Sequence, residues 1–210
     1  FEAGPGISSQ HKAVLRFRED NIGHAIGVPF KKVMVRKGLV LDGVFHSEVS
    51  PYTANMYAKK VTGKITERSI NNLDPVQRFV APSNLHELLG EMCNGRINFG
   101  VTIASQPHIQ SLRATSNSPI ISTMPLPTLL KILGVECLHQ FRHADIHVNR
   151  WRIPDCDVNQ TLYFPGAETN VYRATLTGED LIIEPIQPLS EADEKYIAKS
   201  FFVTLSQAHF

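Results

Sequence analysis

Two short turn signals, each placed between strand-like stretches, most constrain how this chain folds. The first is Asp42-Gly43, which separates the apolar stretches 39–41 and 44–45, and Asp-Gly in this setting is a strong local sign of a tight β-hairpin. The second is the Thr-Gly-Glu-Asp segment at 177–180, which joins two further apolar-rich stretches. Hairpins connect antiparallel strands, so these signals predict an antiparallel or mixed sheet rather than a purely parallel one.

The remaining pattern supports a sheet with helices packed against it. Strands are expected over residues 30–36, 119–125, 141–152, 160–164, 171–177 and 181–186. Helices are expected over residues 51–62, 84–93, 126–133 and 191–205. Ser50 and Pro51 form a typical helix start, and Gly63 and Gly134 are typical helix stops. Because the helices and strands interleave irregularly, the expected fold class is α+β (or α/β) with a mixed to antiparallel sheet.

Composition excludes several classes of protein. The 210 residues are 42% hydrophobic, which is enough for a sizeable core. There are 21 basic and 20 acidic residues and no basic tract longer than two, so the chain lacks the charge pattern of a nucleic-acid binder. No apolar run approaches the 18 or so residues of a membrane span. Three widely separated cysteines form neither a C-x-x-C motif nor an even disulfide set, so a cytoplasmic location is expected.

The first residues have the pattern that closes a strand of a nucleotide-binding unit. Phe1-Glu2 is followed by the glycine-rich turn 3–6. In a dinucleotide-binding βαβ unit, an acid at the end of the second strand accepts hydrogen bonds from a ribose hydroxyl. The G-x-G-x-x-G turn that precedes such a strand does not occur in this chain. Two interpretations stay open: Glu2 binds a cofactor ribose, or it is an ordinary solvated acid.

Four stretches, taken in order, resemble a known flavoprotein superfamily. They are Phe1-Glu2-Ala3-Gly4, the segment 120–127 (Ile-Ile-Ser-Thr-Met-Pro-Leu-Pro), the segment 160–165, and the pair 171–175 and 181–184. Their order and spacing are similar to those of the flavin-binding amine-oxidase-like superfamily, in particular UDP-galactopyranose mutase-like FAD proteins. The resemblance spans residues 1 to about 185, without the N-terminal G-x-G-x-x-G and the C-terminal flavin segment.

This resemblance implies a function and a domain organisation. The chain would be the substrate-domain part of a two-domain Rossmann-type flavoprotein: an FAD-dependent oxidoreductase, or a mutase-like enzyme acting on a sugar nucleotide or small polar substrate. In that case residues 1–30 are the remnant of a dinucleotide-binding unit, 31–190 a substrate-binding mixed domain, and 191–210 a C-terminal helix. The alternative is a non-catalytic binding or scaffold protein that has lost the flavin site. The pattern does not define the oligomeric state.

The resemblance also names candidate binding residues, whereas no catalytic residue can be assigned. Arg173 and Tyr172 would approach the substrate diphosphate, and a guanidinium fork can donate two charged hydrogen bonds to such a group. The alternative for Arg173 is an ion pair across the sheet, for example to Glu184. On a regular strand Tyr172 and Arg173 point to opposite faces, so both can line one pocket only if the strand has a bulge.

Two further sets of residues have patterns that suggest ligand binding. Arg16 and Arg18 share one side of an extended segment and could meet a cofactor phosphate, because they lie close in sequence to the ribose candidate Glu2. Arg18 is therefore a candidate cofactor-binding residue alongside Glu2; a solvated strand face is the alternative. His139, His143 and His147 have helical metal-ligand spacing. Their segment has the pattern of a strand, however, in which residues four apart lie ~13 Å apart, and no metal site is expected.

Overall fold

The computed structural model describes residues 16–66, 69–98, 100–116, 118–141, 147–154 and 156–201. They fall into two compact units. The described residues of the first, the sheet unit, lie within 16–85 and 147–201, and those of the second, the helical unit, lie within 86–141. This division rests on contacts between residues, and the functional boundaries expected at residues 30 and 190 stay a prediction.

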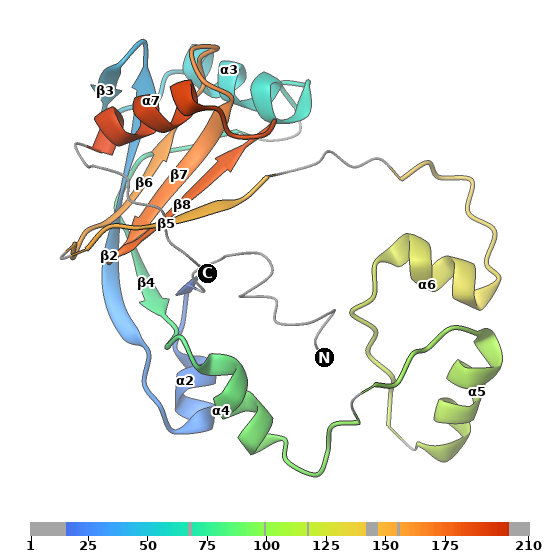
Figure 1. Cartoon of the computed structure of the whole chain (residues 1–210). Coiled ribbons are helices and arrows are strands. Elements are labelled where there is room, and N and C mark those ends of the chain that lie inside the picture. The colour runs from blue at the N-terminus through green and yellow to red at the C-terminus, as the bar shows by residue number, and fades with distance from the viewer. Residues whose placement is uncertain are drawn as a thin grey trace. The chain divides into compact units, whose positions relative to one another are not determined.

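The sheet unit contains all the described strands (Figure 1). Its strands are β1 (Arg16–Phe17), β2 (Lys31–Leu41), β3 (Val44–His46), β4 (Val76–Val80), β5 (Asn149–Arg152), β6 (Asn159–Tyr163), β7 (Val171–Thr177) and β8 (Asp180–Pro185). Its helices are α2 (Asn21–Ile26), α3 (Pro51–Thr62) and α7 (Glu191–Phe201). Helix α4 (Leu85–Met92) begins at its boundary, and α5 (Gln106–Thr115) and α6 (Leu126–Leu133) belong to the helical unit.

The strands form one mixed sheet, which confirms the predicted α+β class. The strand order is β1-β4-β2-β6-β7-β8-β5, with β3 also paired to β2. The β2–β6 pair is parallel, and the other described pairs are antiparallel. The long strand β2 pairs through residues 31–35 with β4 and through residues 36–39 with β6. It therefore joins the two halves of the sheet.

Each face of the sheet has its own hydrophobic core. Adjacent residues of a strand point to opposite faces, and on β2 the neighbours Leu39 and Val40 belong to different buried clusters. Leu39 packs with Tyr57 of α3. Val40 belongs to the cluster that holds Ile197 of α7, which is completely buried. Helices α3 and α7 thus cover opposite faces, which we call the α3 face and the α7 face.

Both predicted hairpins are present. Asp42 and Gly43 link β2 to β3 with φ angles of 52° and 74°, the left-handed values that a type I′ turn needs at both central positions. Gly178 links β7 to β8 with a φ of 57°. The favoured turn residues therefore occur where the chain requires positive φ.

Helix α3 also begins and ends as predicted. The Ser50 hydroxyl accepts a hydrogen bond from the Thr53 N–H at 3.2 Å, and the Thr53 hydroxyl accepts one from the Ser50 N–H at 3.0 Å. This reciprocal capping box satisfies two backbone donors of the first turn. Pro51 is the first helical residue, and Gly63 ends the helix in the left-handed conformation.

Other expectations were wrong or incomplete. The expected strand at 119–125 is irregular: Ile121 is 75% exposed, and among the described residues this segment has no strand partner. An apolar run forms a strand only when a neighbouring strand supplies its hydrogen bonds. The expected strand at 141–152 is limited to β5 in the described residues, because 142–146 lie outside them. Helices α2 and α5 and strand β4 were not anticipated.

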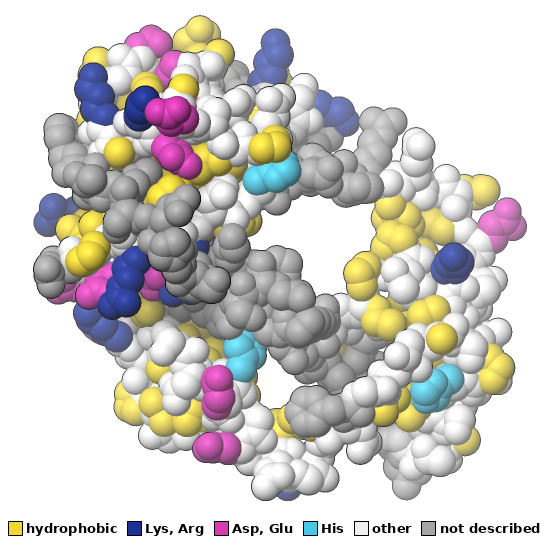
Figure 2. All heavy atoms as spheres, in the orientation of Figure 1, with side chains coloured by type: hydrophobic (Ala, Val, Ile, Leu, Met, Phe, Trp, Pro, Cys, Tyr) yellow, Lys and Arg dark blue, Asp and Glu magenta, His cyan; other side chains and the backbone are white. Residues whose placement is uncertain are grey.

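The helical unit differs from the sheet unit in how little it buries. None of its described residues between 86 and 141 is buried. Figure 2 shows hydrophobic side chains gathered on the surface of the part of the chain that carries α5 and α6. Of the described hydrophobic residues of this unit, Leu138 is 97% exposed. No described helix combines the length and apolar character needed to cross a membrane.

Candidate functional site

A bulge in β7 places both predicted substrate-binding residues on one face of the sheet. Val171 pairs with Pro185 and Arg173 pairs with Glu184, so Tyr172 is an extra residue on β7. An extra residue reverses the alternation of side chains beyond it. Tyr172 packs in the α3-face core, and Arg173 lies on the same face. The structure therefore contains the bulge that the sequence argument required.

Arg173 and Tyr172 both contact the carboxylate of Glu184. The Nε of Arg173 donates to Oε2 of Glu184, and Nη2 donates to Oε1 at 2.5 Å. The Tyr172 hydroxyl donates to the same Oε1 at 3.1 Å. Burial alone lowers the pKa of the Arg173 guanidinium, but the hydrogen bonds and charge of Glu184 outweigh this and raise it. The ion pair considered as an alternative for Arg173 is thus present, and its Nη1 takes no part in it.

Next to this pair, the α3 face has a hollow of about 180 Å³. Strands β1, β4, β2, β6 and β7 each contribute side chains to it. The lining residues are Arg16, Val35, Lys37, Val76, Arg78, Thr161, Tyr163, Arg173 and Thr175. Four of these described lining residues are basic and none is acidic, so the hollow is strongly positive.

Arg16 carries a buried hydrogen-bond donor that has no acceptor in the described part of the chain. Its Nη1 is buried and has no hydrogen-bond partner among the described residues. Burial lowers the pKa of its guanidinium, and the nearby charges of Arg173 and Arg78 lower it further, while Tyr163 and Glu184 offset part of this shift. A buried donor without a partner is costly. An anion in the hollow would supply the missing acceptor and offset the repulsion between the three arginines.

Lys37 and Arg78 also lack an acidic partner in the described contacts. Lys37 Nζ lies 3.4 Å from the amide oxygen of Asn72, and Arg78 Nη1 donates to the backbone oxygen of Gln77 at 2.8 Å. Both acceptors are neutral, so they leave the positive charge uncompensated. The positive potential of the hollow therefore comes mainly from Arg16, Lys37 and Arg78.

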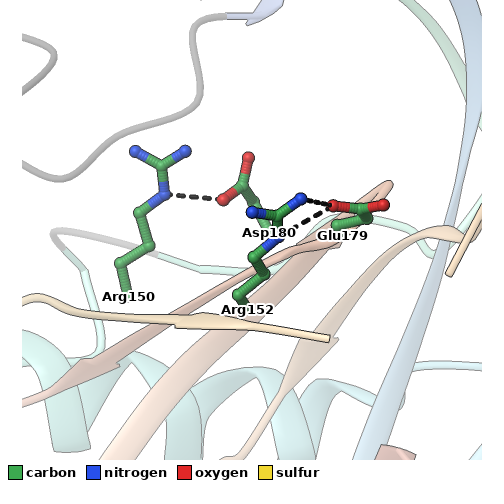
Figure 3. Close-up of polar contacts among 4 residues, drawn as sticks. All are labelled: Arg150, Arg152, Glu179 and Asp180. Carbon is green, nitrogen blue, oxygen red and sulfur yellow. Dashed lines mark hydrogen bonds and ion pairs between the residues drawn. The ribbon is translucent and has the colours of Figure 1, made fainter. Parts of the chain in front are cut away.

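Arginines at the edge of the sheet provide a contrast. Arg150 and Arg152 rise from one side of β5 toward the β7–β8 turn (Figure 3). Arg150 pairs with Asp180 at 2.7 Å, and Arg152 pairs with Glu179 at 2.7 and 2.9 Å. These charges are neutralised in place, as is that of Arg173 by Glu184, whereas Arg16, Lys37 and Arg78 contact no carboxylate in the described interactions.

The structure separates the two arginines that the sequence placed together. Strand β1 contains two residues, and the chain bends at residues 18 and 19. As a result Arg16 lines the hollow, while Arg18 is exposed and does not. Glu2, the other cofactor candidate, lies outside the described residues.

Two basic residues of the hollow, Lys37 and Arg78, were not among the predicted binding residues. Lys37 continues the side of β2 on which Val33 and Val35 lie, so extending that alternation by one step could have found it. Arg78 lies on β4, a strand that the sequence did not predict. Its position depends on the pairing of β4 with β2, which is far away in sequence.

A second polar cluster holds the loop that leads into the β7 bulge. The Lys60 ammonium, at the end of α3, donates to four backbone oxygens at 2.7–2.9 Å, those of Phe164, Gly166, Thr169 and Val171. Burial lowers the pKa of Lys60 to about 8, while the charges of Glu168 and Asp193 raise it. Since the four carbonyl dipoles also favour the ammonium form, we expect Lys60 to be charged at neutral pH.

Asp193 holds the same loop from the other face. It is 4% exposed. Its Oδ1 accepts hydrogen bonds from the Thr169 hydroxyl at 2.6 Å and the Asn170 N–H at 2.8 Å, and its Oδ2 accepts two from Ser190. Burial raises the pKa of this carboxyl, but the four hydrogen bonds favour the charged form and make the net shift downward.

The described residues contain no group of three or more histidine, cysteine, aspartate or glutamate side chains that could hold a metal ion. His139 is exposed and His143 lies outside the described residues. The cationic hollow is therefore the feature of the described chain best suited to bind a ligand.

Comparison of the chain with protein-family models, with curated proteins and with solved structures found no match.

Proposed function

We propose that this chain is the substrate-binding part of an FAD-dependent enzyme, an oxidoreductase or a UDP-galactopyranose mutase-like protein, that acts on a sugar nucleotide or small polar substrate. The observation that carries the proposal is the cationic hollow beside Tyr172 and Arg173 on the α3 face. A sugar nucleotide carries a diphosphate, and guanidinium groups bind such a group through paired charged hydrogen bonds.

In this proposal the two predicted residues have different roles. Tyr172 is 1% exposed, so it does not reach a ligand in the hollow. It orients Glu184, which in turn fixes the guanidinium of Arg173. Arg173 lines the hollow, and its Nη1 is available to donate to a phosphate oxygen. Tyr172 is then a positioning residue and Arg173 a ligand-binding residue.

The described residues support the substrate side of the proposal rather than the cofactor side. Of the residues expected to hold FAD, Glu2 lies outside the described part of the chain and Arg18 is exposed. When bound, FAD would supply the redox chemistry, and the residues of this chain would bind and orient the substrate.

The first test combines spectroscopy with ligand binding. The natural purified protein is examined for flavin absorbance and for a flavin released by acid, and the binding of UDP and UDP-galactose is measured by calorimetry. The proposal expects a flavin and binding of both nucleotides. A colourless protein that takes up no added FAD contradicts the enzyme proposal and favours the non-catalytic alternative.

A pair of variants tests the binding role of Arg173. Because Glu184 would be left without its partner, the substitution is the double change Arg173→Met and Glu184→Gln, with Arg152→Met as the control. We expect the double variant to bind UDP about tenfold more weakly or worse, which corresponds to the loss of one charged hydrogen bond. Equal affinity in the double variant and the control contradicts a contact between Arg173 and the diphosphate.

A further inference from the structure

The cations of the hollow are not equivalent. Arg173 is already engaged with Glu184, whereas Arg16, Lys37 and Arg78 contact no carboxylate in the described interactions. We propose that Arg16, Lys37 and Arg78 form a binding site for one dianionic phosphate group, and that the Arg173–Glu184 pair forms the wall of this site. The proposal rests on the proposed function, because it assigns the phosphorylated end of the substrate to particular residues.

The register of the sheet aligns hydrogen-bond donors in a row across three strands. Lys37 of β2 pairs with Thr161 of β6, and Thr161 pairs with Thr175 of β7. Directly paired residues have Cβ atoms about 5 Å apart on one face of a sheet. The hydroxyls of Thr161 and Thr175 lie 3.2 Å apart. One of these hydroxyls donates to the other, so the Lys37 ammonium and the one remaining hydroxyl hydrogen form a polar floor that can donate to phosphate oxygens.

The arginines of this site come from two further strands of the sheet. Arg78 lies on β4, which pairs with β2, and Arg16 lies on β1, which pairs with β4. The Nη1 of Arg16 is buried without a partner in the described structure. Arg16 is also repelled by Arg78 and Arg173. An anion-binding role explains this arrangement better than a structural one, because packing alone gains nothing from it.

The size of the hollow limits what it can contain. Pockets for drug-sized ligands have volumes of roughly 300–1,000 Å³, and this hollow measures about 180 Å³. It can accommodate a phosphate group, while a nucleoside or a sugar attached to that group would extend outside it. Specificity for the rest of the substrate therefore lies with residues outside the hollow.

The experiment titrates the full chain with inorganic phosphate and with pyrophosphate, and follows heat release and melting temperature. Acetate at equal ionic strength serves as the monoanion control. The variants are Arg16→Gln and Lys37→Met, and Arg152→Gln is the matched control, because it removes an exposed arginine outside the hollow. We expect Arg16→Gln and Lys37→Met to weaken phosphate binding about tenfold or more, and Arg152→Gln to leave it unchanged.

A second readout separates binding from folding. If the role of Arg16 is to bind an anion, Arg16→Gln removes its repulsion with Arg78 and Arg173. The ligand-free variant then melts at or above the melting temperature of the wild type. Phosphate then raises the melting temperature of the wild type and of Arg152→Gln, but not that of Arg16→Gln. A wild-type chain that does not bind phosphate or pyrophosphate overturns the inference, as does a ligand-free Arg16→Gln variant that melts well below the wild type.

The same titrations distinguish this inference from the proposed function. Binding of phosphate and pyrophosphate without binding of UDP or uptake of FAD leaves the anion site in place and contradicts the sugar-nucleotide enzyme. Binding of UDP with an affinity that Arg16→Gln and Lys37→Met do not change supports the proposed function and overturns the anion site.

Discussion

A single buried carboxylate connects the start of α7 to the loop before β7. Asp193 accepts four hydrogen bonds, two from the 169–170 segment and two from Ser190. Each of these donors would lose its acceptor if the carboxylate were removed or protonated. Asp193 is therefore expected to contribute to stability in a pH-dependent manner.

We predict that Asp193→Asn lowers the free energy of unfolding at pH 7 by about 1–3 kcal/mol. Because the folded-state pKa of Asp193 is lowered, the unfolded chain takes up the proton first as the pH falls. Its contribution is present above the ordinary carboxyl pKa of about 4 and is lost as the pH drops through the lower folded-state pKa. Urea unfolding at pH 7 and pH 3 measures both effects.

The control for Asp193→Asn is Glu191→Gln, on the same helix. Glu191 is exposed and pairs with Lys195 at 2.5 Å, and such surface pairs contribute little. The two variants should differ clearly at pH 7 and converge at acidic pH. Equal stability at pH 7 contradicts the role given to Asp193.

Lys60 offers a test of the loop that it holds. We predict that Lys60→Met lowers the free energy of unfolding by at least about 2 kcal/mol, because four backbone oxygens lose a charged donor. The neighbouring Lys59 is exposed, so Lys59→Met changes the same charge without this loss. Chemical unfolding compares the two, and similar curves would show that the four contacts contribute little.

At the scale of residues, the sequence pointed to Arg173, which lines the hollow, and to the bulge that brings Arg173 and Tyr172 to one face. Tyr172 is buried beside the hollow, and substrate binding by either residue stays a prediction. Lys37 could have been found by extending the alternation of β2, whereas Arg78 could not, because a residue becomes part of a site through the strands that lie beside it. No local pattern around Arg78 indicates that β4 lies next to β2.

At the scale of elements, the β2–β3 turn provides a sharp test of backbone conformation. Gly43 has a φ of 74°, and an added Cβ at Gly43 meets no atom within 4 Å. The left-handed conformation is nevertheless costly for residues with a Cβ. We predict that Gly43→Ala lowers the free energy of unfolding by about 1–2 kcal/mol.

The matched control is Gly90→Ala. An added Cβ at Gly90 also meets no atom, but Gly90 lies within helix α4, where alanine is preferred to glycine. This variant should be neutral or more stable, so the two substitutions should have opposite signs in a thermal unfolding experiment. A stable Gly43→Ala variant would show that the type I′ turn does not form in solution.

Prediction of elements succeeded where the signal is local. The Asp42-Gly43 turn, the Ser50 cap and the Gly134 stop each specify their backbone through the residue itself. The apolar run 119–125 failed because a strand also requires a partner. Strand β4 was not predicted because its sequence lacks the alternation of apolar and polar residues that marks a half-buried strand. Apolar Val76 and charged Arg78 lie on the same face of this strand.

At the scale of the whole molecule, burial is distributed unevenly. The sheet unit contains two buried clusters, whereas no described residue between 86 and 141 is buried. Local stability follows buried apolar contacts. We therefore predict slow amide hydrogen exchange in β6, β7 and β8 and fast exchange in α5 and α6, as measured by mass spectrometry. Similar protection in both sets would show that the α5–α6 region has a core comparable to that of the sheet.

The parallel pairing of β2 with β6 has a consequence for biosynthesis. A ribosome releases β2 before β6, together with β3 and β4, which both pair with β2. The β2 edge that pairs with β6 through residues 36–39 has to wait until β6 emerges, after translation of α4, α5, α6 and β5. Over that interval the nascent chain presents an open strand edge, the type of surface on which aggregation begins. Completion of this sheet is therefore a late event that depends on translation of the final third of the sequence.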